Sequence, residues 1–494
     1  MFSFSNLLTF ALRKRYEMGQ RGEILLEVVS QRLQYIGRTL LTPHPFAIRR
    51  GQTYVVVGEN GSGKSTLAQI IERGWNIGMN RILGDKRSLK IKSIEFSDIH
   101  SLTGFSDSYY QQRFESMSSD GIPTIEELVG NKFTPERWDE LCRQLSISDI
   151  LHKRVNFLSS GELRKFLIIN MFTIRPDILI VDNPYIGLDT RSRDLLNEML
   201  QRIASQGTAV VLLLCNTVDI PQFTDFVLPL KRMEVGQMIA YSLSLKSRID
   251  DLFETKGGLE YMPDIATRAQ GSSYKIAFEL RHCNVSYGST TILSDVNWRV
   301  AAGERWALLG ENGSGKSTLL SLVYADNPQG YRNDITLFDR RRGTGESIWD
   351  IKRHIGYISP EMHLYFDSGV NVLTVVATGL RDTLGCFGRI DDNMKSLARQ
   401  WMDTLGIGHL GERQLNTLSS GEQRLTLIAR TFIKNASLLI LDEPLHGLDQ
   451  CQKRLVADII GRILEQPGRS IVYVTHYESE IPKMIGNVFR LSRP

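Results

Sequence analysis

The chain has 494 residues, of which 42% are hydrophobic and 23% are charged, and its formal net charge is +4. This length predicts about two to four domains, each large enough to bury a core. The charge is too small to indicate binding to nucleic acid or to an anionic membrane by itself. A membrane-spanning helix needs about 20 apolar residues. The apolar run from Ala209 to Cys215 is far shorter and predicts a buried strand instead.

Two further features bear on the cellular compartment. The five cysteines show no CxxC motif and no metal-ligand spacing, which predicts reduced thiols of a cytosolic protein; they are Cys142, Cys215, Cys283, Cys386 and Cys451. Near the N-terminus, the apolar stretch Phe2–Leu12 precedes the basic residues Arg13–Arg15. A secretory signal has the opposite order. We interpret residues 1–19 as a short arm, or as an over-extended start with Met18 as the first residue.

The chain contains an internal repeat. The segment GENGSGKST occurs at Gly58–Thr66 and again at Gly310–Thr318. The segment LSSGE also occurs twice, and an apolar run that ends in aspartate follows each copy, at Asp182 and Asp442. The order persists and the spacing nearly so, which indicates duplication of a whole domain. We predict an N-terminal arm (1–19), a first copy (20–250), a linker (251–275) and a second copy (276–494).

Apolar runs bounded by turns alternate with amphipathic patterns in both copies. This alternation predicts α/β domains with a largely parallel sheet covered by helices. In chain order, the expected buried strands are Val55–Val57, Ile178–Val181, Val210–Leu214, Leu438–Leu441 and Ile471–Val474. A helix is expected after the second LSSGE, because apolar residues recur there at i, i+3, i+4 and i+7; they are Leu425, Ile428, Ala429 and Phe432.

GENGSGKS matches the phosphate-binding loop G-x-x-x-x-G-K-[ST]. Its glycines let backbone N–H groups turn toward phosphate, at the positive end of the following helix. We expect Lys64 and Lys316 to neutralise the outer phosphates, and Ser65 and Ser317 to ligate magnesium. The expected nucleotide-binding residues of the two loops are Gly58, Glu59, Asn60, Gly61, Ser62, Gly63, Lys64, Ser65 and Thr66, and Gly310, Glu311, Asn312, Gly313, Ser314, Gly315, Lys316, Ser317 and Thr318.

LSSGE resembles the signature sequence of ABC ATPases, and the order of phosphate loop, signature and apolar strand is that of the family. The resemblance implies two tandem P-loop NTPase domains of ABC type without a transmembrane domain, with ATP and Mg²⁺ as cofactors. It implies that Asp182 and Asp442 hold magnesium. In the family, two cassettes pair head to tail, and the signature of one reaches the γ-phosphate held by the other. The signature residues so implied are Ser159, Gly161, Ser419 and Gly421.

Family members stack adenine on an aromatic residue that precedes the phosphate loop. Tyr287 lies 16 residues before Gly303, and Tyr35 lies 16 residues before Gly51, at the matching position of the first copy. These two tyrosines are therefore the candidates for adenine stacking. The alternative for each is an ordinary core tyrosine.

The two copies differ at the positions of the family's catalytic residues. The resemblance makes Glu443 the base that activates water and His476 a contact to the γ-phosphate. The first copy has Asn183 and Asn216 at these positions. An amide cannot accept the proton, and a general base is worth about 10²–10⁴ in rate. We therefore expect one hydrolytic site, which combines the second copy's residues with the first copy's signature. The other site, with Lys64 and the second signature, should bind ATP and turn over slowly.

The stretch Asn327–Gly356 resembles the second cassette of ModF-type proteins, which are duplicated ATP-binding subunits associated with bacterial molybdate uptake. Arg340–Arg342 in this stretch are expected to form a solvated basic loop, with contact to an anionic partner as the alternative. The family's coupling glutamine is missing after the strand at Ile355–Ser359, where Pro360 and Glu361 follow. In the first copy its place is not assigned, and the candidates are Asp98, Gln111 and Gln112.

Three functions compete. The favoured one is the ATPase component of a transporter, molybdate-type by resemblance, with a separate membrane permease as partner. The chain would then be cytoplasmic, or peripheral at the inner face of the plasma membrane, and no direct nucleic-acid binding is expected. The second is a translation-associated ATPase, which the short, weakly charged linker disfavours. The third is a regulatory switch without transport, which the missing glutamine keeps open. Chromosome-maintenance ATPases are excluded, because no long coiled coil fits between Lys64 and Ser159.

Overall fold

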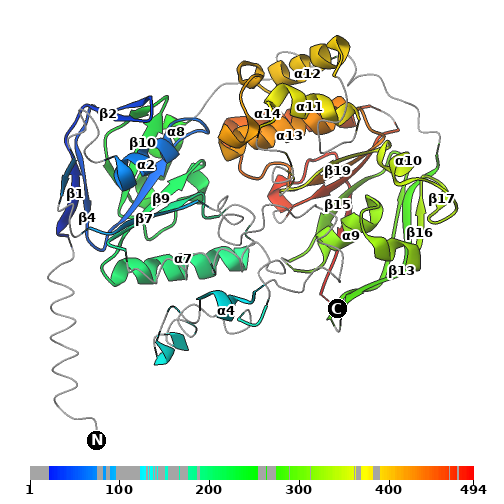
Figure 1. Cartoon of the computed structure of the whole chain (residues 1–494), viewed down its shortest axis with the longest axis horizontal. Coiled ribbons are helices and arrows are strands. Elements are labelled where there is room, and N and C mark those ends of the chain that lie inside the picture. Colours follow the sequence, from blue (N-terminus) through cyan, green and yellow to red (C-terminus); the bar gives the residue numbers. More distant parts are fainter. Residues whose placement is uncertain are drawn as a thin grey trace, which may run out of the picture. The chain divides into compact units, whose positions relative to one another are not determined.

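The computed structural model describes residues 22–74, 82–84, 89–95, 123–129, 132, 134–136, 138–139, 142, 151–153, 166, 176–185, 188, 190–253, 263, 274–288, 290–311, 313–360, 362, 366, 369–381, 390–466, 468–475 and 478–493. They form two compact units that divide between residues 255 and 256 (Figure 1). The expected arm at residues 1–19 and most of the expected linker lie outside the described residues. In the described part of the chain, no helix combines the length and the apolar character that a membrane crossing requires.

The first unit is built on a sheet whose strands run in the order β2-β3-β11-β10-β5-β9-β8-β7. The strands are β2 (Arg32–Tyr35), β3 (Arg38–Leu41), β5 (Thr53–Val57), β7 (Ile91–Glu95), β8 (Ile178–Asp182), β9 (Ala209–Leu214), β10 (Phe226–Lys231) and β11 (Glu234–Val235), with β12 (Ile239–Ala240) paired to β10. The pairs among β10, β5, β9, β8 and β7 are parallel. A separate antiparallel sheet contains β4 (Phe46–Arg49), β1 (Ile24–Val28) and β6 (Ile82–Gly84).

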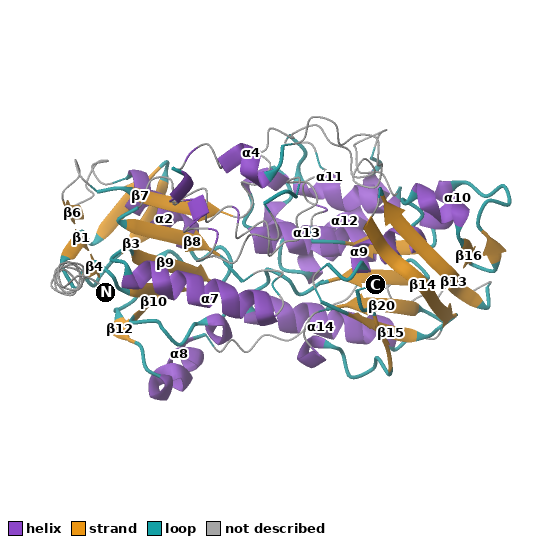
Figure 2. Cartoon of the chain, turned by 90° about the horizontal axis from the view of Figure 1, so that it is seen from below, coloured by secondary structure: helices purple, strands orange, loops and turns teal. Residues whose placement is uncertain are grey.

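Both faces of the parallel sheet in this unit are buried. Val55 and Val57 of β5 belong to the same hydrophobic cluster as Leu200 of α7 (Thr190–Ser205). Tyr54 and Val56 belong to the opposite cluster, with α2 (Lys64–Arg73) and the β1 sheet. Figure 2 shows α7 running along the sheet. Burial on two sides explains why these strands are continuous apolar runs rather than alternating patterns. The other described helices are α4 (Ile125–Val129) and α8 (Lys246–Leu252).

The second unit repeats this plan. Its parallel sheet has the order β18-β19-β20-β15-β21, and its antiparallel sheet has the order β14-β13-β16-β17. The strands are β13 (Ile276–Tyr287), β14 (Thr290–Ala301), β15 (Arg305–Leu309), β16 (Asp334–Leu337), β17 (Arg340–Arg341), β18 (Ile355–Ile358), β19 (Leu438–Asp442), β20 (Ser470–Val474) and β21 (Asn487–Arg490). The helices are α9 (Lys316–Val323), α10 (Ile348–Lys352), α11 (Val372–Ala377), α12 (Asp392–Thr404), α13 (Ser420–Ile433) and α14 (Gln450–Leu464).

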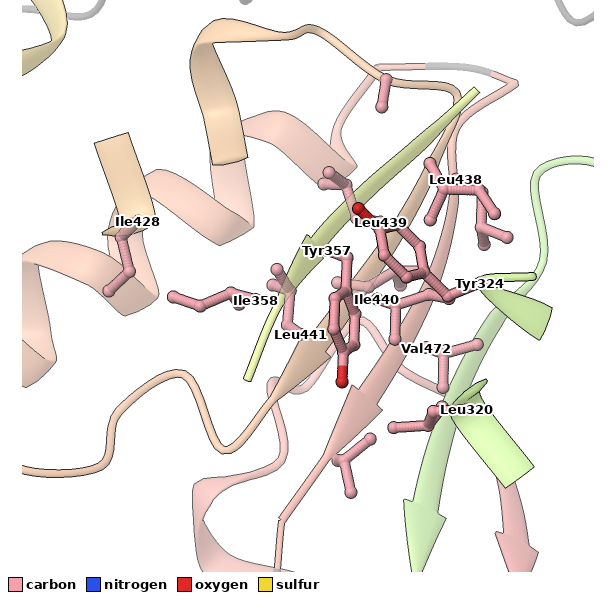
Figure 3. Packing of buried hydrophobic residues seen from close by; sticks show 14 of the residues in the cluster. Leu320, Tyr324, Tyr357, Ile358, Ile428, Leu438, Leu439, Ile440, Leu441 and Val472 are labelled. Atoms are coloured by element: carbon pink, nitrogen blue, oxygen red, sulfur yellow. The ribbon is translucent and has the colours of Figure 1, made fainter. Parts of the chain in front are cut away.

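One hydrophobic cluster joins both sheets of the second unit. Figure 3 shows its packing around β18 and β19, where the rings of Tyr324 and Tyr357 stack with their centroids 4.5 Å apart. Ile428 of α13 and Leu441 of β19 belong to the same cluster. The packing therefore ties the helix that follows LSSGE to the strand that ends in Asp442.

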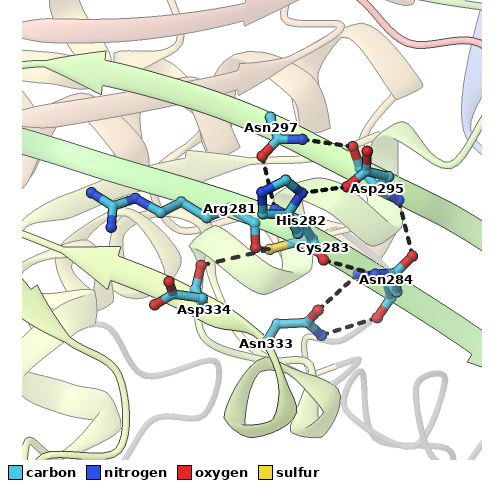
Figure 4. A network of polar contacts seen from close by, with 8 residues as sticks. All are labelled: Arg281, His282, Cys283, Asn284, Asp295, Asn297, Asn333 and Asp334. Carbon is cyan, nitrogen blue, oxygen red and sulfur yellow. Dashed lines mark hydrogen bonds and ion pairs between the residues drawn. The ribbon is translucent and has the colours of Figure 1, made fainter.

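The long pair β13–β14 contains an irregular segment held by side chains. His282 and Asp295 have positive φ angles, and the register shifts between Leu280 and Cys283 and again between Cys283 and Val285. Side-chain amides replace part of the ladder there: Asn297 accepts from the N–H of His282, and Asn284 accepts from the N–H of Asp295 (Figure 4). Local side-chain bonds of this kind compete with the regular ladder.

The structure confirms the five predicted strands, which are β5, β8, β9, β19 and β20, and the predicted helix after the second LSSGE, which is α13. The sequence pattern did not anticipate the antiparallel sheet in each unit. The described cysteines, which exclude Cys386, are free thiols.

Candidate functional site

The phosphate loop of each unit connects a central parallel strand to a helix. Lys64 is the first residue of α2, and its ammonium donates to the carbonyl oxygens of Gly58 at 2.7 Å and Glu59 at 2.9 Å. Lys316, the first residue of α9, donates in the same way to Gly310 at 2.7 Å and Glu311 at 2.9 Å. The two loops thus have the same internal bonding, and each places a buried cation at a helix N-terminus, where anions bind favourably.

The first glycine of each loop is required by close packing. A Cβ at Gly58 would meet the carbonyl oxygen of Leu230, and a Cβ at Gly310 would lie 2.6 Å from the carbonyl oxygen of Leu491. Gly63, just before Lys64, has φ 109°, which L side chains rarely adopt. The loop conformation therefore depends on glycine at these positions.

Asp182 lies at the end of β8, next to the phosphate loop of the first unit. The Ser65 hydroxyl donates to Asp182 Oδ2 at 2.8 Å, while the other carboxylate oxygen is buried without a hydrogen-bond partner. Burial raises the pKa of Asp182, and the hydroxyl of Ser65 and the charge of Lys64 partly oppose this shift. A buried carboxylate oxygen beside a hydroxyl fits the oxygen ligands that Mg²⁺ prefers. In the second unit, Asp442 is buried at the end of β19, and Ser317 follows Lys316 in α9.

Asn183 and Glu443 follow these aspartates and have the same backbone geometry. Their φ angles are 46° and 48°, both in the left-handed region. The N–H of Asn183 donates to Leu213 at 2.9 Å, and that of Glu443 donates to Val474 at 2.9 Å. The two turns hence differ at this position in the side chain and not in the backbone.

The second signature forms the N-terminus of α13. Ser419 caps this helix, and Ser419 and Glu422 form a reciprocal capping box, with the N–H of Ser419 donating to Glu422 at 2.8 Å. Gly421 is buried in the first turn. The corresponding Ser159 and Gly161 lie outside the described residues, as do Asn312 and His476. Asn216 is buried just beyond β9. Leu213 pairs with Asp182, and Val474 pairs with Asp442; two residues further along the chain stand Cys215 and His476. The expected match of Asn216 with His476 is therefore wrong, and Cys215 stands at the matching position of the first unit.

Each of the two candidate adenine-stacking tyrosines is the last residue of a strand, β2 at the edge of the sheet that contains β5, and β13 in the antiparallel sheet of the second unit. Tyr35 is the last residue of β2 and Tyr287 the last residue of β13, and both are half-buried. The Tyr287 hydroxyl accepts a hydrogen bond from the Asn327 side chain at 3.0 Å. Their use in stacking remains a prediction.

Comparisons with known proteins identify the architecture. A family model described as ABC transporter matches residues 41–186 and 293–446. The chain is 34% identical over 460 residues to the ABC transporter ATP-binding protein ModF of Escherichia coli, covering 91% of this chain and 92% of that protein. The chain belongs to the ABC family. It is a tandem-cassette ABC ATPase of the ModF type.

Other relatives widen this picture. An uncharacterized ABC transporter ATP-binding protein of Schizosaccharomyces pombe is 27% identical, covering 89% of this chain and 92% of that protein. Among solved structures, the RNase-L Inhibitor aligns with TM-score 0.52 and 18% identity over 94% of this chain and 88% of that chain. A chain from a model of ribosome-bound archaeal Pelota and ABCE1 aligns with TM-score 0.57 and 18% identity, covering 94% and 77%. At such identity these structures show the fold alone.

One expectation for the second cassette is wrong in part. Arg340 and Arg341 are exposed, as expected of a solvated basic loop. Arg342 is buried instead: it lies over the Tyr331 ring at 4.6 Å and donates to the Ala325 carbonyl at 3.2 Å. Its side chain packs against the segment between α9 and β16, to which Ala325 and Tyr331 belong.

Sequence reasoning missed two residues beside Glu443. His446 places Nδ1 3.7 Å from Glu443 Oε2. Arg424 of α13 donates to main-chain carbonyls around Asp442 and Glu443. A signal for Arg424 was present in the repeat, since Arg164 occupies the matching place after the first LSSGE. No comparable signal marks His446, because Ile186 stands at its matching position.

Proposed function

We propose that the second cassette hydrolyses ATP with Glu443 as the base, and that the first cassette binds ATP and turns it over slowly. The shared backbone geometry of Asn183 and Glu443 supports this proposal. Nearly equal φ angles and equal N–H bonds direct both side chains alike, so the difference at this position reduces to carboxylate against amide. His476 would contact the γ-phosphate, and the first cassette has Cys215 at the matching position.

Each phosphate loop would bind ATP together with Mg²⁺. Support comes from the buried lysines and, in the first cassette, from the carboxylate oxygen of Asp182 that has no hydrogen-bond partner. Magnesium would take Ser65 and Asp182 as ligands there, and Ser317 and Asp442 in the second cassette. When bound, it would supply positive charge that offsets the negative charge built up on the phosphates during hydrolysis. Tyr35 and Tyr287 would stack the adenines.

The cassettes would pair head to tail within the chain, as the family resemblance implies. Ser159 and Gly161 would complete the hydrolytic site, and Ser419 and Gly421 would complete the slow one. Ser159→Arg should block turnover although it leaves Glu443 unchanged, whereas Ser419→Arg should cost less. Phosphate release measured for both variants tests this arrangement, and equal activities would contradict it.

The decisive experiment on catalysis compares Glu443→Gln with Asn183→Ala. Glutamine keeps the size of the side chain and removes the proton acceptor, so steady-state turnover should fall by about 10²-fold or more with ATP binding intact. Asn183→Ala should change turnover several-fold at most. Equal losses in the two variants would show that the cassettes are not functionally different.

We further propose that the ATPase drives a separate membrane permease, molybdate-type by its likeness to ModF. The second candidate function is a regulatory switch without transport. Pro360 favours it, because this residue lies just beyond β18, where transporters of the family carry a coupling glutamine. Purification of the tagged chain from its host in mild detergent distinguishes these two candidate functions. An integral membrane protein that co-purifies and stimulates ATP turnover supports transport. Full turnover without any membrane partner supports the switch.

A further inference from the structure

Arg424 is a buried arginine in the second turn of α13, and it holds main-chain atoms from two other segments. Its guanidinium donates to the carbonyl oxygens of Asp442 at 2.7 Å, Glu443 at 2.5 Å and Pro444 at 3.3 Å. It also donates to the carbonyl of Ser359, just beyond β18, at 2.7 Å. One side chain thus joins the signature helix, the turn that carries Glu443 and the strand end before Pro360.

The energetics of this arrangement are unusual for a helix residue. Burying a charge costs several kcal/mol unless hydrogen bonds compensate. Burial lowers the pKa of Arg424 to about 10, and the charges of Asp442 and Glu443 oppose this shift. These four hydrogen bonds all go to main-chain carbonyls, and such bonds fix the path of the backbone rather than balance a side-chain charge.

The backbone that Arg424 holds needs support. Glu443 has φ 48°, and a non-glycine residue in that region costs about 1–2 kcal/mol. The peptide carbonyls before and after this strained residue determine the direction of its Cα–Cβ bond. Arg424 binds the carbonyls of Asp442 and Glu443 at once, so it fixes that direction from both sides.

We propose that Arg424 is a positioning residue for ATP hydrolysis, which holds the Glu443 carboxylate in its working direction by fixing the backbone turn to the signature helix. The proposal rests on the assignment of Glu443 as the base. Loss of the guanidinium leaves the carboxylate, the phosphate loop and their charges in place. It removes the restraint on the turn, so turnover should fall while ATP affinity stays nearly the same.

The test uses Arg424→Lys and Arg424→Met, with Arg430→Lys and Arg430→Met as matched controls. Arg430 is also a buried arginine of α13, but it bonds Thr378 Oγ1 at 3.2 Å and lies over the Phe366 ring. Steady-state kcat and KM, nucleotide binding and the urea midpoint are measured for the full chain. Lysine keeps the charge but cannot donate to four carbonyls at once. If the methionine variant does not fold, the lysine variant alone decides the test.

We expect Arg424→Lys to lower kcat by about tenfold or more and to change KM for ATP less than about threefold. Arg430→Lys should retain kcat within about twofold, even if its urea midpoint falls as far as that of Arg424→Lys. Equal kcat losses in the two lysine variants, or an unchanged kcat in Arg424→Lys, would overturn the positioning role. Glu443→Gln is measured in parallel. If Glu443→Gln leaves turnover intact, the proposed function fails. If Glu443→Gln loses turnover while Arg424→Lys keeps full activity, only the positioning role of Arg424 is refuted.

Discussion

The left-handed conformation of Glu443 leads to a prediction about stability that is independent of catalysis. With φ 48°, alanine at this position would carry a conformational cost of about 1–2 kcal/mol, and glycine would carry almost none. Glycine pays about 0.4–1 kcal/mol in extra unfolded-state entropy. The difference leaves Glu443→Gly more stable than Glu443→Ala by about 0.5–1 kcal/mol. Both variants lack the carboxylate, so neither catalysis nor its charge enters the comparison.

The control is the pair Asp458→Gly and Asp458→Ala, for which the expected difference in free energy of unfolding has the opposite sign. Asp458 is exposed in the interior of α14, where glycine should be less stable than alanine by about 1 kcal/mol. Urea unfolding followed by tryptophan fluorescence measures both pairs. Four of the six tryptophans report on the second cassette: Trp298, Trp306, Trp349 and Trp401. The argument that the turn at Glu443 is strained would be refuted if the alanine variant at position 443 is as stable as the glycine variant, while alanine is the more stable of the two at position 458.

Three further outcomes follow from contacts in the described residues. Lys352→Met should lower the free energy of unfolding in urea by about 3–5 kcal/mol, because the buried Asp326 loses the ammonium group that lies 2.5 Å from its carboxylate. The double variant Lys352→Met with Asp326→Leu should recover part of this stability. Gly58→Ala should reduce bound nucleotide in the Glu443→Gln background from two per chain to one, since its methyl would meet Leu230; two retained nucleotides would contradict this. Burial raises the pKa of the Cys283 thiol to about 11, so maleimide at pH 8 should leave it unmodified in the native chain and label it after unfolding.

The sequence predicts the phosphate loops and the central strands well, for a physical reason. Val210–Leu214 is apolar at every position because both faces of its sheet are buried, and such a run is visible without a structure. The outer sheets are harder to predict. The β13–β14 pair shifts register at His282 and holds its irregular segment with asparagine side chains, so no clean alternation marks it.

The candidate site shows a similar division. Lys64, Asp182 and Glu443 belong to local motifs, and their chemistry follows from residue type and spacing. Arg424 does not, because its role depends on carbonyls that come from Ser359 and from the turn after Asp442, far away in the chain. An arginine on a helix is ordinarily exposed. Only the repeat, with Arg164 at the matching position, distinguishes it in the sequence.

The geometry of α13 connects two parts of the proposed mechanism within one cassette. Its N-terminus carries Ser419 and the capping box that would meet a γ-phosphate held by the first cassette. Its second turn carries Arg424, which binds the backbone at Glu443. A buried helix transmits a displacement as a rigid element, since closely packed interiors deform little. Under the head-to-tail pairing proposed above, ATP at the slow site would act through α13 on the base of the hydrolytic site. In the proposed mechanism, an intact phosphate loop in the first cassette would therefore matter for turnover at Glu443, even though Asn183 cannot serve as a base.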